Sequence, residues 1–279
     1  MFDKDAIQLL AQAESISAAA TAVDGAVGSK FSAGTVALPS DFTVHDLEKK
    51  LQMRRRARGV MTTSSVAPFA EYVGVHKEPG AAVFVDQDAM TAVAVLNLGT
   101  PNEPGHADNI AKMVAKRMAA YTALLQHASG QGLAQAKAAE FMEDWPGYFK
   151  FFNDSGEITA GQAIAAVRKL TIESMRKLEA TEQQLSATRS AFESVSATST
   201  EPLPTTIYFS CVPYHGLAER QFVLRLGVQT GGKDPAIVLR IVKKEQHDEE
   251  MAAELSELVA SSLTESGVPV MVGKYLPTA

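Results

Sequence analysis

Cysteine is almost absent from this sequence of 279 residues, because Cys211 is the only one. A single thiol excludes an intramolecular disulfide and a zinc site built from several cysteines. Cys211 lies within the β-like run TIYFSCVPY, which predicts a buried and unreactive thiol.

Long apolar runs and familiar enzyme motifs are lacking as well. No segment approaches the roughly 18 apolar residues that a membrane-spanning helix needs. The opening stretch MFDKDAIQLLAQAES holds acidic residues and no unbroken apolar core, so we expect a cytoplasmic protein with no membrane partner. The motifs GxxxxGK[ST], GxGxxG, GxSxG and HExxH are all missing, which favours a protein that is not an enzyme and uses no cofactor.

The composition is that of a folded protein, with 46% hydrophobic and 21% charged residues. Aromatic residues make up only 7%, and alanine is abundant, which favours helical packing over a pure β-sandwich. The net charge of -6 argues against a dedicated nucleic-acid coat, although it leaves room for a local basic patch.

Alternating apolar residues predict two β-hairpins. The first is AAVFVDQDAMTAVAVLNL, with its turn at residues 86–88. The second is formed by QFVLRLGV and AIVLRIV around the glycine-containing turn QTGGKDP, and VPVMVGKYL can add an edge strand. Separated hairpins mixed with helices predict an α+β fold, with antiparallel sheet and packed helices.

Helical periodicity and capping signals predict the helices. The expected helices cover residues 5–23, 42–51, 109–128, 134–145 and 244–263. Residues 23–35 read as a glycine-containing loop. Thr159 and Gln162 form a capping box that opens one long helix over residues 160–194.

That long helix carries apolar residues at spacings typical of a packing seam. They are Ile172, Met175, Leu178, Leu185 and Phe192. A helix of roughly 30 residues spans about 45 Å, so it is expected to cross a whole domain or to reach a second copy of the chain.

Three regions are expected along the chain. Residues 1–35 form an N-terminal helix and loop, and residues 36–200 hold the first hairpin and the long helix. Residues 201–279 hold the second hairpin and the closing helix, after the Ser/Thr/Pro-rich stretch SATSTEPLPTT, and are expected to pack on the same core.

Two groups of cations are candidate phosphate-binding residues. The first is the cluster Lys49, Lys50, Arg54, Arg55, Arg56 and Arg58. It reads alternatively as a cation-rich helix end or an inter-subunit surface, and no aromatic residue is interleaved with it.

The second group is the pair Arg225 and Arg240, which face each other if the second hairpin turns symmetrically. Either Glu219 and Glu245 neutralise this pair, or the pair clamps an anion. Lys243 and Lys244 follow close by in the sequence.

Metal ligation has weaker candidates. His106 and Asp108 follow the turn-rich stretch LNLGTPNEPG, and Asp86 and Asp88 could add oxygen ligands. The alternative is that Asp108 caps a helix that begins at Asn109.

In the closing helix, one face carries a histidine and two acids that resemble part of a carboxylate metal site. They are His247, Glu250 and Glu254. The apolar stripe of this helix leaves the acids largely toward solvent, so the sequence predicts no metal.

Several blocks resemble the YfdQ-like family of phage and prophage proteins. They include FTVHDLEKKLQMRRRARGVMTTSSVAPFAEYV, FVDQDAMTAVAVLNLGTPNEPGHADN, AEFMEDW and FVLRLGVQTGGKDPAIVLRIVKKEQHDEEMAAEL. The resemblance covers residues 36–263 and concerns a domain of unknown function. It implies a protein made in the cytoplasm of a bacterial host, often from a gene beside replication and recombination genes, and it assigns no catalytic residue.

Three functions follow as hypotheses. The first is a non-enzymatic protein that acts by homo-oligomeric assembly and by contacts with phage or host proteins. The second is a nucleic-acid-binding accessory factor in phage replication or recombination. The third is a binder of a small anionic nucleotide.

Overall fold

The computed structural model describes residues 4–28, 51–53, 56–153, 155–170, 203–229 and 236–276. They belong to two compact units, Met1–Ala57 and Arg58–Ala279. In the first unit, helix α1 (Lys4–Gly28) confirms the helix predicted at residues 5–23. The helix continues through residues 23–28, so the loop predicted to begin there is wrong over this stretch.

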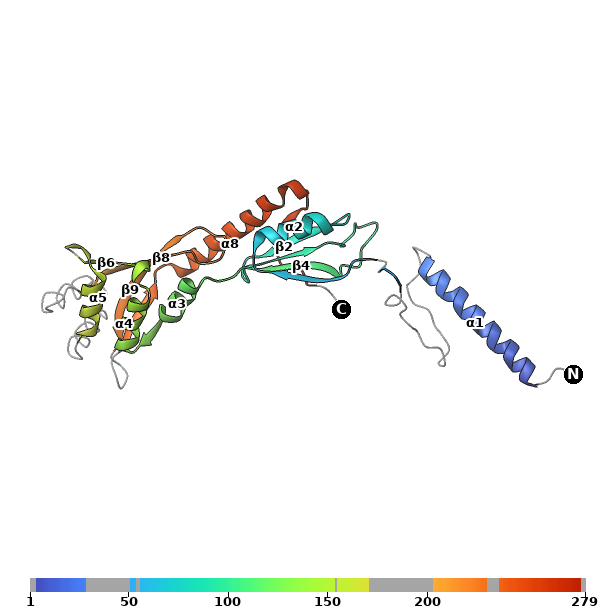
Figure 1. The fold of residues 1–279 in the computed structure, drawn as a ribbon, viewed down its shortest axis with the longest axis horizontal. Helices are drawn as coiled ribbons and strands as arrows, with labels where there is room; N and C mark the ends of the chain where they lie inside the picture. Colours follow the sequence, from blue (N-terminus) through green and yellow to red (C-terminus); the bar gives the residue numbers. More distant parts are fainter. Residues whose placement is uncertain are drawn as a thin grey trace. The chain divides into compact units, whose positions relative to one another are not determined.

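The second unit contains a five-stranded sheet with the order β1-β4-β3-β2-β11 (Figure 1). Its strands are β1 (Gly59–Thr63), β2 (Ala82–Asp86), β3 (Thr91–Val95), β4 (Asn109–Val114) and β11 (Val270–Val272). Strands β2 and β3 form the first predicted hairpin, and β11 confirms the predicted edge strand. Because β1 pairs with β4 and β11 pairs with β2 in parallel, this sheet is mixed.

A six-stranded sheet in the same unit has the order β5-β10-β9-β8-β6-β7, and all of its pairings are antiparallel. Its strands are β5 (Ser129–Leu133), β6 (Phe149–Asn153), β7 (Gly156–Ile158), β8 (Thr206–Cys211), β9 (Arg220–Gln229) and β10 (Ala236–Ile241). Strands β9 and β10 form the second predicted hairpin. Strand β8 pairs with β9 on one side and on the other with β6, which comes from the middle of the chain.

Helices cover one face of the six-stranded sheet. They are α3 (Ala119–His127), α4 (Gln135–Asp144), α5 (Ala160–Arg168) and the beginning of α8 (Lys244–Ser262). Helix α2 (Val66–His76) packs instead on β1 and β4 of the five-stranded sheet. On the six-stranded sheet, Tyr121 of α3 stacks on Phe222 with the ring centroids 5.3 Å apart. Phe141 of α4 stacks on Phe209 of β8 at 5.9 Å.

Helix α8 links the two sheets. It packs against α2 and β11 of the five-stranded part, and Figure 1 shows α2 beside it. Its His247 ring lies 4.8 Å from Phe222 of the six-stranded sheet. The buried residues of both sheets accordingly belong to one hydrophobic core.

The α+β class is therefore confirmed, and so are the helices at α4 and α8. The helix predicted at residues 109–128 is wrong in its first half, because residues 109–114 form strand β4 and the helix α3 begins only at Ala119. Residues 109, 111 and 113 are buried, so the stretch follows a period of two between β1 and β3.

The predicted capping box is present. The Thr159 hydroxyl accepts a hydrogen bond from the Gln162 backbone, and the Gln162 side chain accepts one from the Thr159 backbone. The predicted start of the helix at Ala160 is therefore confirmed. However, α5 ends at Arg168 and residues 169–170 are not helical, so the prediction of one unbroken helix from residue 160 to 194 is wrong. The proposed seam of Ile172, Met175, Leu178, Leu185 and Phe192 lies outside the described residues.

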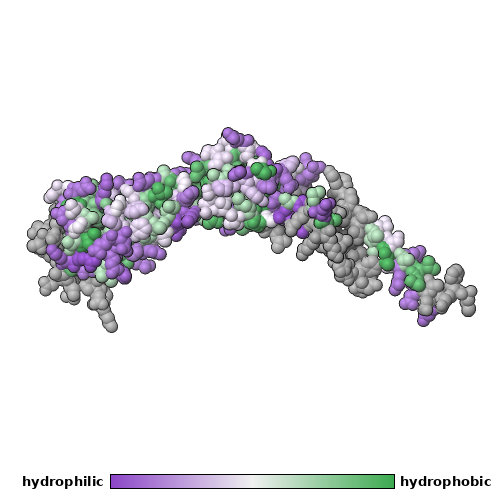
Figure 2. All heavy atoms as spheres, viewed as in Figure 1, coloured by the Kyte–Doolittle hydropathy of each residue, from purple (hydrophilic) through white to green (hydrophobic). Residues whose placement is uncertain are grey.

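Within the ranges that the structure describes, no helix combines the length and the apolar character needed to cross a membrane. The exposed apolar residues include Leu9, Leu10 and Ile16 of α1, which are 60–67% accessible. Figure 2 shows hydrophobic side chains exposed along this helix.

Candidate functional site

The six-stranded sheet has one buried face and one open face. On β8, Ile207, Phe209 and Cys211 are buried, whereas Tyr208 and Ser210 between them are partly exposed. The same alternation runs along β9 and β10. We call the second side the open face, and its side chains include Lys150, Phe152, Thr206, Tyr208, Val223, Arg225, Val238 and Arg240. It is the side opposite the aromatic contacts with α3 and α4.

The pair Arg225 and Arg240 lies on this open face as the sequence predicted. The two residues are direct cross-strand partners in the β9–β10 ladder, and both side chains are exposed. Among the described residues, neither guanidinium forms an ion pair, so the predicted neutralisation by Glu219 and Glu245 is not observed there. Like charges placed directly opposite each other are destabilising, which favours an anion between them.

Arg240 is supported by the neighbouring edge strand. It pairs with Ser129 of β5, next to a register shift between Val238 and Arg240. A Cβ added to Gly130 would lie 3.9 Å from Cγ of Arg240, so the aliphatic stem of the arginine crosses the glycine. The stem of Arg240 thus lies in van der Waals range of this position at the edge of the open face.

Aromatic residues continue the open face beyond the arginines. The rings of Phe152 on β6 and Tyr208 on β8 meet edge to face, with their centroids 5.5 Å apart. Tyr208 is the cross-strand partner of Lys150 on one side and of Val223 on the other. Arg225 is two residues beyond Val223 on the same strand, and therefore lies diagonally from Tyr208 on the same face.

The open face is cationic, although the chain has a net charge of -6. Lys150, Arg225 and Arg240 contribute three exposed positive charges. Glu157 of β7, the partner of Phe152, brings a negative charge to the same face. The arrangement can therefore bind an anion while presenting two aromatic rings.

The other predicted cation cluster is described only in part. Lys49, Lys50, Arg54 and Arg55 lie outside the described residues. Arg56 is half-buried and Arg58 is exposed, and both interact with other groups of the protein. Lys244, in turn, forms an ion pair with Asp248 within α8.

The turn-rich stretch before β4 is built around buried asparagines. Asn97 donates from Nδ2 to Oδ1 of Asp108 at 2.9 Å, and its Oδ1 accepts from the backbone N–H of Asn109 at 3.0 Å. Asp108 therefore stabilises the loop through its hydrogen bond with Asn97. The prediction that Asp108 caps a helix is wrong, because strand β4 begins at Asn109. His106 is exposed at the surface of this loop.

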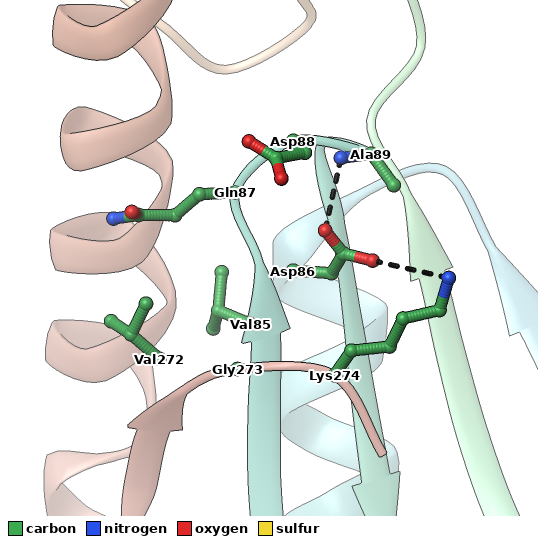
Figure 3. A pocket seen from close by; sticks show the side chains of 8 residues that line it. All are labelled: Val85, Asp86, Gln87, Asp88, Ala89, Val272, Gly273 and Lys274. Carbon is green, nitrogen blue, oxygen red and sulfur yellow. Dashed lines mark hydrogen bonds and ion pairs between the residues drawn. The ribbon is translucent and has the colours of Figure 1, made fainter. Parts of the chain in front are cut away.

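An open hollow of about 490 Å³ lies where the turn after β2 meets the end of β11 (Figure 3). Asp86 accepts a hydrogen bond from the Ala89 backbone at 3.1 Å, and its other oxygen lies 3.9 Å from Nζ of Lys274. The carboxylate of Asp86 is therefore already used by the turn and by a cation. Throughout the described ranges, no three His, Cys, Asp or Glu side chains gather closely enough to hold a metal.

The acids of the closing helix bind an arginine. Arg220 donates to Glu250 at 2.7 Å and to Glu254 at 2.8 Å, and Glu254 also accepts from the Ala218 backbone. The hydrogen bond from Gln246, followed by the hydrogen bond and the charge of Arg220, lowers the pKa of Glu250. Glu250 and Glu254 thus fasten α8 to β9, whereas His247 turns its ring toward Phe222.

Cys211 is buried, as predicted. Burial, with a smaller contribution from the charge of Glu219, raises the pKa of its thiol to about 12. A thiol with this pKa is protonated at neutral pH and is a poor nucleophile.

The arginine pair was predictable from the sequence, whereas the aromatic pair of Phe152 and Tyr208 was not predicted. The alternation in TIYFSC places Tyr208 opposite Phe209, which is a usable signal. Phe152 comes from a strand that was not predicted, and only the β6–β8 pairing brings it to Tyr208.

A family model described as an uncharacterized conserved protein, DUF2303, matches residues 3–275. The match spans the described helices and strands from α1 to β11. No curated protein and no solved structure matches the chain. The family description assigns no activity, so a proposal for function depends on the surface described above.

Proposed function

The chain belongs to the uncharacterized DUF2303 family, and we propose that it is a nucleic-acid-binding protein that holds phosphates on its open face. The observation that carries this proposal is the cross-strand pair Arg225 and Arg240. Both guanidiniums are exposed, and neither has an acidic partner among the described residues. A phosphate between them relieves their repulsion and accepts planar, paired hydrogen bonds from arginine.

The first prediction concerns the double variant Arg225→Gln/Arg240→Gln. We expect its affinity for a labelled oligonucleotide of about 16 nucleotides to fall at least about tenfold, because charge-assisted hydrogen bonds are lost. The slope of log K against log salt should flatten by about 0.7 to 0.9 for each arginine removed. Fluorescence anisotropy between about 50 and 200 mM salt measures both quantities.

A matched control removes the same charge elsewhere. Lys112 on β4 and Lys116 just after it are exposed cations outside the six-stranded sheet. Lys112→Gln/Lys116→Gln should leave affinity and salt slope close to those of the wild type. Equal losses in both double variants would show that only net charge matters, and would overturn the assignment to the open face.

The resemblance to YfdQ-like proteins supports a phage or prophage origin and a role beside replication or recombination, in the cytoplasm of a bacterial host. The origin, the role and the location are proposed, because the DUF2303 family is described only as uncharacterized. Neutralisation of phosphates is the chemistry that such a role and the open face have in common.

Self-association is a second candidate function, favoured by helix α1. Leu9 and Ile16 lie two helical turns apart and are 67% and 60% exposed. Exposed apolar side chains repeated at this spacing favour contact with a second copy of the helix. This candidate involves a different surface from the open face, so both functions can belong to one protein.

The second prediction is therefore a solution mass larger than the 29.8 kDa of one chain. Light scattering at micromolar concentration should give a multiple of that mass, and Leu9→Ser/Ile16→Ser should shift it toward the monomer. Val75→Ser, at a 73% exposed apolar position on α2, should leave the mass unchanged. A wild-type protein that is strictly monomeric would exclude self-association.

A further inference from the structure

We infer that the open face takes single-stranded nucleic acid, with bases stacking on Tyr208 and Phe152 while phosphates lie against Arg225 and Arg240. This inference rests on the proposed function and specifies its ligand. The aromatic pair carries it, since a phosphate alone needs no ring. Both rings are partly exposed on the open face, next to three exposed cations.

The cross-strand register places the two kinds of group at neighbouring positions. Tyr208 stands between Lys150 and Val223 across β6, β8 and β9. Arg225 lies on the diagonal from Tyr208, and Arg240 is the next residue across the sheet from Arg225. Cross-strand diagonals are about 7 to 8 Å long, within reach of long side chains. One short segment of single-stranded nucleic acid can therefore contact an arginine and an aromatic ring at the same time.

A duplex fits this surface poorly. The cations and rings occupy four adjacent strands, β10, β9, β8 and β6. At a strand spacing of about 4.8 Å, these span about 14 Å, which is wider than the major groove of about 12 Å. In a duplex the bases are also stacked on one another, so their faces are not available to Tyr208 and Phe152. In single strands the base faces are free, and aromatic stacking together with cationic grooves is the usual way to bind them.

A small anion would use only part of the open face. It would sit between Arg225 and Arg240 and would leave Lys150 and both rings without a ligand. The aromatic residues therefore separate a single strand from a small anion, and they do so independently of the arginines. Neither stacking nor phosphate contact involves the 2′-hydroxyl, so DNA and RNA of one sequence should bind alike.

The test uses the full chain with Tyr208→Leu/Phe152→Leu, which removes the rings and keeps apolar side chains. Its probes are a single-stranded oligonucleotide of about 16 nucleotides as DNA and as RNA, the DNA duplex of that sequence, and inorganic polyphosphate as a competitor without bases. We expect at least about a tenfold loss of single-strand affinity and little change in the inhibition constant of polyphosphate.

Two controls keep the result interpretable. Tyr208→Phe retains the ring and should bind nearly as the wild type does, after its thermal midpoint has been checked. Tyr148→Leu removes an aromatic residue that is 39% exposed and that stacks on Phe209, from the helix-covered side of the sheet. It should leave single-strand binding unchanged.

The outcomes separate the inference from the proposed function. Tighter binding of the single strand than of the duplex, lost with the rings, supports both. Suppose instead that binding depends on the arginines, but that removing the rings does not change the affinity and that single-stranded and duplex probes bind equally well. This result would overturn the inference and leave the proposed function standing. Binding that none of the open-face variants affects would overturn both.

Discussion

Replacing Gly105 with alanine should lower the free energy of unfolding by about 3 kcal/mol or more. A Cβ at this position would lie 2.0 Å from the carbonyl oxygen of Asn97 and 2.8 Å from its carbonyl carbon. These are backbone atoms, so no side-chain rotation relieves the overlap. Gly105 has no left-handed φ, so the expected loss comes from steric overlap and not from backbone conformation.

A displacement of Asn97 by this overlap would also disturb the five-stranded sheet. This residue is 5% exposed, and its side chain binds both Asp108 and the Asn109 backbone. Asn109 begins β4, which lies between β1 and β3. A displaced Asn97 therefore leaves buried polar groups without partners, at a cost of about 1 to 3 kcal/mol beyond the steric term.

Thermal and denaturant unfolding measure this loss, with an expected drop in melting temperature of about 6 to 12 °C. Gly74→Ala is the control, since Gly74 lies in α2 and an added Cβ would meet no atom within 4 Å. Alanine in a helix should stabilise the protein there by about 0.5 to 1 kcal/mol. If Gly105→Ala melted within about 2 °C of the wild type, the close packing of this loop on Asn97 would be disproved.

The elements predicted correctly from the sequence are those that are determined by residues close together in the chain. The capping box at Thr159 and Gln162 needs only four consecutive residues, and it is present. The second hairpin alternates so regularly that its register, including the pair Arg225 and Arg240, followed from symmetry about the turn. In both cases the residues that fix the structure are close together in the chain.

Residues 109–114 show why other elements could not be predicted. Ile110, Met113 and Val114 match helical spacing, yet burial falls on Asn109, Ala111 and Met113. A short stretch fits both periods, and pairing with β1 and β3 decides between them. The β1 segment GVMTT has no long apolar run, so this pairing leaves little trace in the sequence.

In the candidate site, too, one part could be predicted from the sequence and the other could not. The arginine pair belongs to one hairpin and was predictable. The aromatic pair joins Phe152 to Tyr208 from strands separated by more than fifty residues, so its formation depends on the order of the sheet. The sequence contained no aromatic residue within its basic cluster, whereas the folded sheet places two rings next to its cations.

Phe209→Ala should cost about 3 to 5 kcal/mol, the usual range for truncating a buried phenylalanine. Phe209 is fully buried on β8, and its ring centroid lies 4.8 Å from that of Phe149. It also stacks on Tyr148 at 5.6 Å and on Phe141 at 5.9 Å. The truncation leaves a cavity among rings that belong to β6, α4 and the turn before β6. Denaturant unfolding measures the loss, and Phe209→Leu should lose less because it keeps more of the apolar volume.

The adjacent residue Tyr208 makes this prediction a test of the open face, because the two side chains point to opposite sides of β8. Tyr208→Leu should cost about 1 kcal/mol or less in stability, the scale of a cross-strand pair, while it weakens single-strand binding. Phe209→Leu should show the reverse, with a lower stability and an affinity that is retained below its melting temperature. If both leucine variants changed stability and affinity in proportion, binding would follow the integrity of the fold. A separation of the two effects between neighbouring residues would instead assign stability to the helix-covered side of the sheet and ligand binding to the open face.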